Sequence, residues 1–446
     1  MAQFLLYYNY QQIILINYRR LRHMEKIQPS KKISKEIHEL IQNGCDKSDD
    51  LLTLLIQKSV KKIIQETLEQ EINDYLGRDY FQRNQYSRKG YRNGYEPKTL
   101  KTAEGAIDID VPQLRNTETT YRSRLLKQMN HRTSELERLA TEMYVRGLST
   151  RDIEDTFTDD NGTCLMSKDG VSQVTESLND EYNRFCQRDL SVYDVVYLFV
   201  DGVYERMRLT MGSHEAILCA WGILSDGRKM LFHISLGNKE SYLSWNDFFR
   251  SMISRGLRMP LLIVSDGAPG LIKAINECFP KSKRQRCIIH KLRNIATKLP
   301  KAVVKEMMPL FKNVYYQANK KLAMMLATDL IETYADDYPA AIKCFQEDLD
   351  ACLQHIDFPV GHHRYIRTTN LIERCFVEQK RRTKVIPRFL NEKSCLKLVY
   401  ATLIRVSARW NRISMSELDL TLLRKMRALY EPKNEDDRFI SLTIAA

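Results

Sequence analysis

The chain has 446 residues, of which 43% are hydrophobic, and this is enough for two or three domains with cores of their own. Its net charge of +13 favours a polyanionic partner, and nucleic acid ahead of a membrane surface, because the basic residues are interleaved with folded-looking sequence. The ten cysteines are scattered without a Cys-x-x-Cys pair, which argues against a disulfide scaffold and indicates a cytosolic, cytoplasmic protein with reduced thiols. Ribosome-associated and tRNA-handling proteins share this charge balance, so the charge alone does not identify the partner.

Residues 1–23 differ from the rest of the chain. They are rich in Tyr and Ile, contain no acid, and carry their arginines after the apolar part. A secretory signal would place its charge first, and a membrane span would not include polar residues such as Asn9 and Gln11. We therefore interpret 1–23 as a non-native or disordered extension, with Met24 as an alternative start, and expect no membrane association.

Residues 24–125 are predicted to form an N-terminal helical region with a basic arm and a β-hairpin. Apolar residues recur at helical spacing over 31–76. Residues 78–101 interleave Lys and Arg with Tyr and Gly, a pattern that suits a DNA-contacting arm and equally a solvated basic loop. The hairpin is expected from Pro97–Thr102 and Ala106–Val111, which flank a Glu-Gly turn and leave one face wet.

Residues 130–190 are predicted to form a helix-turn-helix-like DNA-binding region. The first helix, Leu136–Arg146, would end at a glycine, and Ser149 would begin a short second helix. Ser167 would cap a third helix, Lys168–Phe185. An ordinary three-helix scaffold would show the same pattern, and the basic balance of the chain favours DNA contact.

Two acids directly follow predicted buried strands. Val195–Val200 and Leu261–Ser265 are apolar runs, and each is followed by Asp-Gly, at Asp201 and Asp266. Such a run before a glycine predicts a strand that stops at a tight turn, so each carboxylate is expected at a strand end. Two such ends can meet around a metal ion, although an Asp-Gly taken singly is often only a turn former.

The order of elements in 191–294 predicts the first part of a catalytic domain. Further strands are expected at Tyr204–Met211, Glu215–Leu224, Lys229–Leu236 and Arg286–His290, and helices at Trp245–Ile253 and Pro269–Cys278. A strand carrying an acid, two antiparallel neighbours and a parallel strand reached through a helix is the order of a ribonuclease-H-like α/β fold. Such a sheet would bring Asp201 and Asp266 side by side.

A third acid lies beyond a helical stretch. Residues 295–365 are helical throughout and are predicted to be an all-helical insertion, and 366–446 would complete the catalytic domain and end in a C-terminal tail. Glu373 lies in a basic helix that starts near Leu371, and Ser394–Trp410 is an amphipathic helix. Asn370-x-x-Glu373 also fits a helix cap. Three carboxylates from separated segments of a basic chain suit metal-assisted cleavage and transfer of phosphodiesters.

Motifs spread over most of the chain form a joint pattern. They are Tyr91-Arg92-Asn93-Gly94-Tyr95, Arg146–Ile153, the stretch 238–294 with Val264-Ser265-Asp266-Gly267 and Arg286-Cys287-Ile288-Ile289-His290, and Thr369–Arg374 followed by Arg381–Ile386. These motifs resemble those of the Mutator-type transposases of bacterial insertion sequences, over about Leu51 to Trp410. The resemblance implies a ribonuclease-H-like fold with a helical insertion. The residues after Asp201 and the segment 387–390 follow the family only loosely, and neither departure removes an acid.

The resemblance also implies a DDE transposase with Asp201, Asp266 and Glu373 as the catalytic and metal-binding acids. Two Mg²⁺ ions, for which Mn²⁺ can substitute, would assist hydrolysis at the element end and attack of the freed 3′-OH on target DNA. Asp201 would bridge both ions, and the other two acids would each hold one.

The family's Cys-x-x-His falls on Cys287 and His290. These residues could be half of a zinc site, but no second Cys/His pair at zinc spacing is evident, because His362 and His363 lie across the insertion. Zinc is therefore not expected, and both residues, with Arg374, are predicted to be auxiliary groups near the active site.

The expected partner is double-stranded DNA, both the terminal repeats of the element and the target. Two ends must be joined together, so a homodimer or larger synaptic complex is expected by analogy. The residues predicted to contact DNA are Arg88, Lys89, Arg92, Arg151, Lys168, Lys291, Arg293, Lys380, Arg381, Arg382 and Lys384. Two other functions share part of the pattern: a ribonuclease-H-like nuclease that cuts without joining, and a catalytically silent DNA-binding regulator, against which the three acids argue.

Overall fold

The computed structural model describes residues 27–45, 50–80, 82, 90–129, 132–158, 162–206, 214–237, 240–384, 386, 389 and 391–429. The predicted extension 1–23 and the predicted DNA contacts Arg88 and Lys89 lie outside these residues. The chain divides into two compact units, one comprising Met1–Glu142 with Thr150–Val174 and the other Met143–Ser149 with Thr175–Ala446. No described helix is long and apolar enough to cross a membrane.

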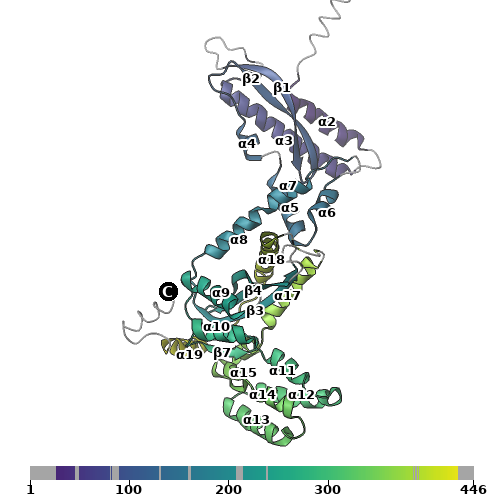
Figure 1. The fold of residues 1–446 in the computed structure, drawn as a ribbon. Helices are drawn as coiled ribbons and strands as arrows, with labels where there is room; N and C mark the ends of the chain where they lie inside the picture. Colours follow the sequence, from purple (N-terminus) through teal and green to yellow (C-terminus); the bar gives the residue numbers. More distant parts are fainter. Residues whose placement is uncertain are drawn as a thin grey trace, which may run out of the picture. The chain divides into compact units, whose positions relative to one another are not determined.

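Unit 1 is built from helices and a long hairpin (Figure 1). Its elements are α2 (Pro29–Asn43), α3 (Leu51–Leu76), β1 (Tyr91–Thr102), β2 (Gly105–Arg115), α4 (Arg124–Met129), the first part of α5 (Ser134–Val145), α6 (Thr150–Thr156) and nearly all of α7 (Lys168–Thr175). Asp50 caps α3 by accepting hydrogen bonds from the backbone N–H groups of Leu52 and Thr53. The core lies between α3 and the hairpin, where Leu68, Leu100 and Ile109 are buried.

The hairpin is confirmed, and it is longer than its alternating pattern predicted. Antiparallel pairing extends from Thr102 opposite Gly105 out to Tyr91 opposite Arg115, with a register shift between Arg92 and Tyr95. Residues 91–101, which the sequence assigned to a basic arm, therefore belong to strand β1.

The helical segment after the hairpin also departs from its prediction. The expected third helix is interrupted at Glu176 and continues as α8 (Ser177–Gln187). Ser167 does cap α7, because its hydroxyl accepts a hydrogen bond of 3.3 Å from the Gly170 N–H. Helices α6 and α7 group with unit 1 and α8 with unit 2, so the predicted helix-turn-helix-like region 130–190 is divided between the two units.

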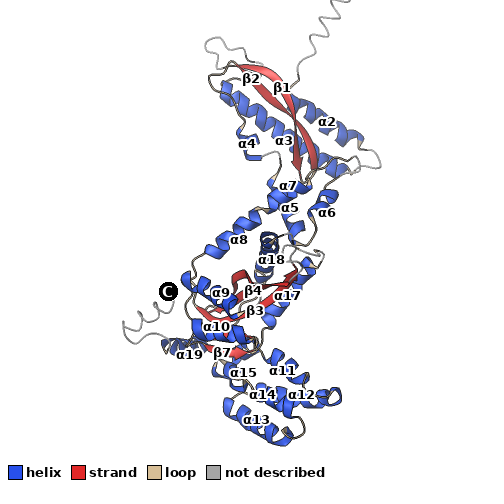
Figure 2. Cartoon of the chain, in the orientation of Figure 1, coloured by secondary structure: helices blue, strands red, loops and turns tan. Residues whose placement is uncertain are grey.

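Unit 2 is centred on a five-stranded mixed sheet with the strand order β5-β4-β3-β6-β7 (Figure 2). The strands are β3 (Val195–Arg206), β4 (His214–Leu224), β5 (Lys229–Gly237), β6 (Leu262–Ser265) and β7 (Lys283–Arg286). Strand β4 runs antiparallel to both β3 and β5, whereas β6 lies parallel to β3 and β7 parallel to β6. Helices α9 (Tyr242–Ser254) and α10 (Pro269–Cys278) make the two crossovers, as predicted.

The two faces of the sheet pack into different cores. Leu198 and Val200 of β3 are buried among residues of α9 and α10, whereas Tyr197 and Phe199 are buried among residues of α17 (Asn370–Thr383) and α18 (Glu392–Ser407). This division follows from the two-residue period of a strand. By the same alternation Asp201 belongs to the face that packs against α17.

Two predictions about the sheet are wrong. Strand β3 does not stop at Asp201 but continues to Arg206, with Gly202 opposite Leu218 of β4, so no separate strand begins at Tyr204. The Asp201-Gly202 pair predicted a turn. A glycine inside a strand can instead mark the close approach of another group. The strand expected at Arg286–His290 is also misplaced, because β7 ends at Arg286 and helix α11 (Ile288–Ala296) begins two residues later.

The segment predicted to be a helical insertion lies within 287–384, where all residues are described and none is in a strand. It contains α12 (Lys301–Tyr315), α13 (Lys320–Tyr334), α14 (Pro339–Gln346), α15 (Leu349–Cys352), two short 3₁₀ turns and α16 (His363–Ile366). Phe311, Tyr315 and Phe345 centre its core. It is fastened to β7 by Asp348, which forms ion pairs with Arg284 and Arg286.

Helix α19 (Glu417–Ala428) was not predicted and lies in what the sequence suggested was a tail. Leu423 of this helix is buried, and Arg427 donates hydrogen bonds to the Asp194 carboxylate at 2.7 Å and to the Val195 carbonyl at 2.8 Å. Ser416 and Asp419 form a capping box at its start. This pair of residues is a helix-start signal in the sequence.

Candidate active site

Asp201 and Asp266 lie side by side, as predicted. Strands β3 and β6 are parallel with Phe199 opposite Val264, so the same register places Asp201 beside Asp266 two residues further on. The Gly202 N–H donates to Asp201 Oδ1 at 2.9 Å, and the Ala268 N–H donates to Asp266 Oδ1 at 3.0 Å.

The electrostatics of this pair favour a bound cation. Loss of hydration, followed by repulsion from Asp266, raises the pKa of Asp201 to about 7. A carboxyl group with such a pKa is only partly ionised near neutral pH. A bound cation would offset the repulsion between Asp201 and Asp266.

A fourth carboxylate, Glu240, stands next to this pair. Burial and the charge of Asp266 raise the pKa of Glu240. Its carboxylate lies against the backbone of Gly202, where a Cβ atom would be 2.5 Å from Glu240 Oε1. The signal in the sequence that could have identified Glu240 is the glycine inside a strand.

Glu373 projects from the first turn of α17. Its N–H donates to the Thr369 carbonyl at 3.1 Å, and Thr369 precedes the helix as its N-cap. Asn370 is already helical, so the alternative reading of Asn370-x-x-Glu373 as a cap is not what the structure shows. Glu373 Oε1 is 3.5 Å from His290 Nε2, and Oε2 is 3.8 Å from Arg293 Nη2.

Cys287 and His290 stand beside Glu373. Cys287 is the N-cap of α11 and is buried, and its Sγ accepts hydrogen bonds from Thr369 N at 3.3 Å and from Thr369 Oγ1 at 3.2 Å. Burial opposes ionisation of this thiol, but its interactions with His290 and Thr369 outweigh burial and lower the pKa of Cys287.

His290 connects the sheet pair to the third acid. Its interaction with Cys287, against the effect of burial, raises the pKa of the imidazole to about 9, and the charges of Asp201 and Glu373 contribute in the same direction. The imidazolium therefore interacts electrostatically with both Asp201 and Glu373. The three catalytic candidates and two of the three predicted auxiliary residues, Cys287 and His290, thus gather in one part of unit 2, and the third, Arg374, is exposed on α17.

Two predicted DNA contacts are engaged inside the protein instead. Lys291 is wholly buried, and its ammonium group donates to the Glu347 carbonyl. Arg92 donates to Asn73 Oδ1 at 2.6 Å and to the Arg78 carbonyl at 2.8 Å. The alternation of basic and aromatic residues did not reveal either role, because both depend on packing partners elsewhere in the chain.

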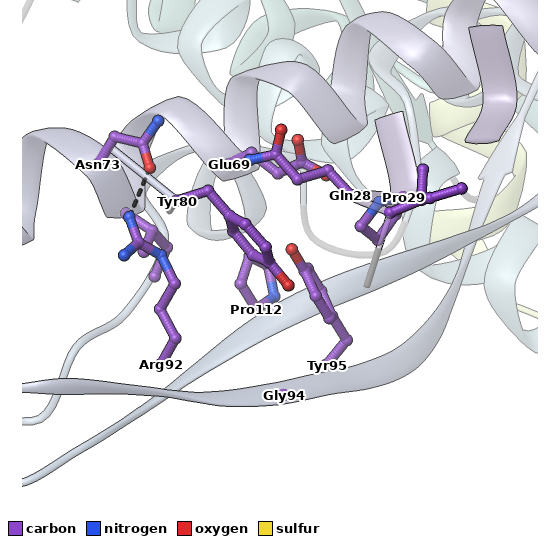
Figure 3. A pocket seen from close by; sticks show the side chains of 11 residues that line it. Gln28, Pro29, Glu69, Asn73, Tyr80, Arg92, Gly94, Tyr95 and Pro112 are labelled. Atoms are coloured by element: carbon purple, nitrogen blue, oxygen red, sulfur yellow. Dashed lines mark hydrogen bonds between the residues drawn. The ribbon is translucent and has the colours of Figure 1, made fainter. Parts of the chain in front are cut away.

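Arg92 also lines a cavity of about 470 Å³ in unit 1. Figure 3 shows Tyr80 and Tyr95 between Arg92 and Pro29 at the start of α2. The Arg92 guanidinium lies 5.6 Å from the centre of the Tyr80 ring, which adds a cation–π contact to its hydrogen bonds.

The other described basic candidates are nearer the surface. Those on α17 are Arg374, Lys380, Arg381 and Lys384, which are exposed, and Arg382, which is partly buried and bonded to Glu378. Arg293 is exposed on α11, and Arg151 and Lys168 are exposed in unit 1. The exposed set on α17 follows one stripe of the helix that carries Glu373.

Glu205 has a structural role that the sequence did not suggest. It lies on β3, and its Oε1 accepts hydrogen bonds from Gln379 Nε2 and, at 2.9 Å, from Thr383 Oγ1 on α17. It thereby ties the helix of Glu373 to the strand of Asp201. Asp226 lies in the turn between β4 and β5 and accepts a hydrogen bond from the Arg228 N–H at 2.9 Å.

Comparison with known proteins gives matches along most of the chain. The family model described as "Transposase, Mutator family" matches residues 30–413. The chain is 30% identical over 368 residues to the transposase for insertion sequence element ISRM5 of Rhizobium meliloti (strain 1021), covering 81% of this chain and 91% of that protein. It is 33% identical over 277 residues to the IS6120 transposase of Mycolicibacterium smegmatis, covering 62% and 85% of the two chains. It is 29% identical over 378 residues to the transposase for IS256 in transposon Tn4001 of Staphylococcus aureus, covering 82% and 95%.

Proposed function

The chain belongs to the Mutator family of transposases, and on that premise we propose that it cuts and joins DNA strands at a metal site formed by Asp201, Asp266 and Glu373. One observation carries this proposal. Asp201 and Asp266 are in register on neighbouring parallel strands, on the face of the sheet that packs against the helix bearing Glu373. The strand order with its helical crossovers supports a ribonuclease-H-like core, interrupted by the insertion between β7 and α17.

The donor set fits a hard divalent cation. Mg²⁺ and Mn²⁺ prefer carboxylate oxygens, and the raised pKa of Asp201 reflects burial of the carboxyl group and the nearby charge of Asp266. Asp201 and Asp266 would hold the ion or ions at the sheet, and Glu373 would complete the set from α17. Bound ions would supply Lewis-acid activation of the attacking and leaving oxygens.

The protein groups around the acids have their own tasks. His290, as an imidazolium, can donate a hydrogen bond to a phosphate oxygen that approaches Glu373. The exposed cations of α17 can bind the DNA backbone on either side of the scissile phosphate. Double-stranded DNA, as element ends and as target, is the substrate that this arrangement serves, and joining two ends together calls for a homodimer or a larger assembly.

The decisive experiment compares Asp266→Asn with Asp226→Asn on terminal DNA of the element in the presence of Mg²⁺. Both substitutions change an Asp that precedes Gly, but Asp226 only forms a hairpin turn. We expect cleavage and joined products from the natural protein and from Asp226→Asn, and neither from Asp266→Asn. Metal-dependent cleavage without joining would assign the protein to nucleases. DNA binding without cleavage by any of the three proteins would assign it to regulators.

A further inference from the structure

Three side chains with different donor atoms converge next to the proposed active site. Cys287 precedes α11, His290 lies one turn into that helix, and Glu373 lies in the first turn of α17. One ligand atom from each, a sulfur, a ring nitrogen and a carboxylate oxygen, lies within 4.8 Å of the other two. The spacing of three residues places Cys287 and His290 on the same side of the start of α11.

Two atoms of this cluster lack the hydrogen bonds that buried polar atoms normally make. Within the part of the chain that the structure describes, His290 Nδ1 and Glu373 Oε1 are buried without a hydrogen-bond partner. Such atoms are uncommon in folded proteins, and an ion at the site is one of the explanations for them. Both atoms belong to the same small cluster, and a cation bound by Glu373 would give Oε1 a partner.

The geometry is close to that of a tetrahedral ion. Nitrogen and oxygen ligands at 2.0–2.2 Å from a tetrahedral zinc ion are about 3.4 Å apart. His290 Nε2 and Glu373 Oε1 are 3.5 Å apart. The Cys287 sulfur is fixed by its two hydrogen bonds from Thr369, which is the type of outer contact that orients thiolate ligands.

The choice of atoms selects the class of cation. Thiolate and imidazole ligands favour zinc and similar soft ions over Mg²⁺, which prefers oxygen alone. We propose that Cys287, His290 and Glu373 form a binding site for a soft divalent cation of the zinc class, with a fourth position open to water or substrate, as in three-ligand zinc sites. This proposal departs from the sequence-based prediction that zinc is not expected. That prediction rested on the lack of a second Cys/His pair, whereas the proposed third ligand is a carboxylate 83 residues beyond His290.

A consequence follows for the proposed reaction, and it rests on the proposed function. Glu373 cannot bind a zinc-class ion together with Cys287 and His290 while it also completes a magnesium site with Asp201 and Asp266. Occupation of the soft site therefore inhibits cleavage supported by Mg²⁺.

The binding test uses Co²⁺, a spectroscopic substitute for zinc, with the full chain and without DNA. We expect one Co²⁺ per chain to produce the intense near-ultraviolet absorption of a cobalt–thiolate bond and Zn²⁺ to displace it. Cys287→Ser should abolish the absorption and weaken Zn²⁺ binding by more than about tenfold, the loss that removal of an outer contact alone can cause. Cys375→Ser should leave both unchanged, because Cys375 is also buried and free but bonds to the Leu371 carbonyl.

Absence of the thiolate absorption in the natural protein, or its survival in Cys287→Ser, would overturn the proposal. His290→Gln and Glu373→Gln must each weaken Co²⁺ binding too, and they decide the matter if Cys287→Ser does not fold. Because no DNA is present, a failure here is distinct from a failure of the proposed transposase activity.

The inhibitory consequence is tested separately by titrating Zn²⁺ into the cleavage reaction of the natural protein at fixed Mg²⁺. Inhibition should follow the Zn²⁺ binding curve. Full cleavage with the soft site occupied would overturn the inhibition.

Discussion

At the scale of single residues, the site depends on how closely charged groups can approach one another. Asp201 has neighbouring acids in Asp266 and Glu240, and Gly202 allows the approach of Glu240 because it has no side chain. Repulsion among these groups is a cost to the folded chain that a bound cation would relieve. Two predictions follow, one from the space at Gly202 and one from the protonation of Asp201.

Gly202→Ala tests the close approach. The new Cβ would lie 2.5 Å from Glu240 Oε1, so the Glu240 carboxylate must leave its position beside Asp201 and Asp266. We expect strand cleavage to fall by roughly tenfold to a hundredfold, the usual effect of a displacement of about 1 Å in an active site. Gly361→Ala is the control, because a Cβ at Gly361 would meet no atom within 4 Å. Equal cleavage by the two variants would show that the position of Glu240 has no effect.

Asp201→Asn tests the protonation of the buried carboxyl group. Its pKa is raised from 3.8 to about 7 on folding, so between these pH values the folded chain holds a proton that the unfolded chain has released. The free energy of unfolding therefore falls as the pH rises through this window. In EDTA at pH 8 we expect Asp201→Asn to be more stable than the natural protein by about 1 kcal/mol or more, and the difference to vanish near pH 4.

Urea unfolding at the two pH values measures this difference, and Asp226→Asn should show the opposite sign. Although burial opposes it, hydrogen bonds from Arg228 lower the pKa of Asp226, so its carboxylate stabilises the fold above the unfolded pKa and loses that effect as the pH falls. A natural protein more stable than Asp201→Asn at pH 8 would contradict the raised pKa.

At the scale of elements, helix α17 must be held against strand β3 for Glu373 to meet the other acids. Ile372, Cys375 and Phe376 supply an apolar contact with the core of the sheet. Apolar packing is non-directional, so it does not by itself fix the rotation of a helix. Hydrogen bonds from Gln379 and Thr383 to Glu205 are directional, and they fix the rotation of α17 against β3.

Glu205→Ala should therefore impair the site from a distance. Gln379 and Thr383 are buried and would lose their acceptor, which costs about 1–3 kcal/mol of unfolding free energy. Cleavage should fall as well, whereas Glu205→Gln keeps an acceptor oxygen and should retain most of both properties. Urea unfolding and strand cleavage measure the two effects. An equal loss with Gln and Ala would indicate that the charge of Glu205, and not its hydrogen bonds, is required.

At the scale of the whole molecule, the net charge of +13 does not by itself tell which basic residues would contact DNA. The described basic residues are not equivalent: Lys291 and Arg92 are engaged in internal contacts, whereas Lys380, Arg381 and Lys384 are exposed on the helix of Glu373. Counterion release makes the number of phosphate contacts measurable from the dependence of affinity on salt.

The triple variant Lys380→Gln, Arg381→Gln, Lys384→Gln should bind DNA more weakly and with a shallower salt dependence. Three lost contacts at about 0.9 each should reduce the slope of log affinity against log salt by about 2.7. Fluorescence anisotropy over a range of salt concentrations measures this slope. A triple change of the exposed Lys301, Lys305 and Lys321 on the insertion removes the same charge and is the control. Identical slopes for both variants would mean that only the net charge matters.

Features set by neighbouring residues were predictable from the sequence. The helix limits at Pro269 and Cys278, the turn at Asp226 and the alternation of the hairpin strands all depend on local periodicity and turn chemistry, and the structure confirms them. The order of strands around the two Asp residues was also readable, because short connections leave few topologies. The resemblance to transposases also predicted which acids are catalytic, and that assignment stays a prediction.

The tertiary structure alone decided what each side chain meets. Strand β3 continues past Asp201 because β4 pairs with it there, and no local signal at Gly202 distinguishes a turn from a close approach. Lys291 is buried and Glu373 faces His290 through contacts between residues more than fifty positions apart. The sequence by itself determined the elements and their chemical types, since those follow from short-range periodicity. Which donors share a site depends on packing between distant segments, and packing is a property of the folded chain.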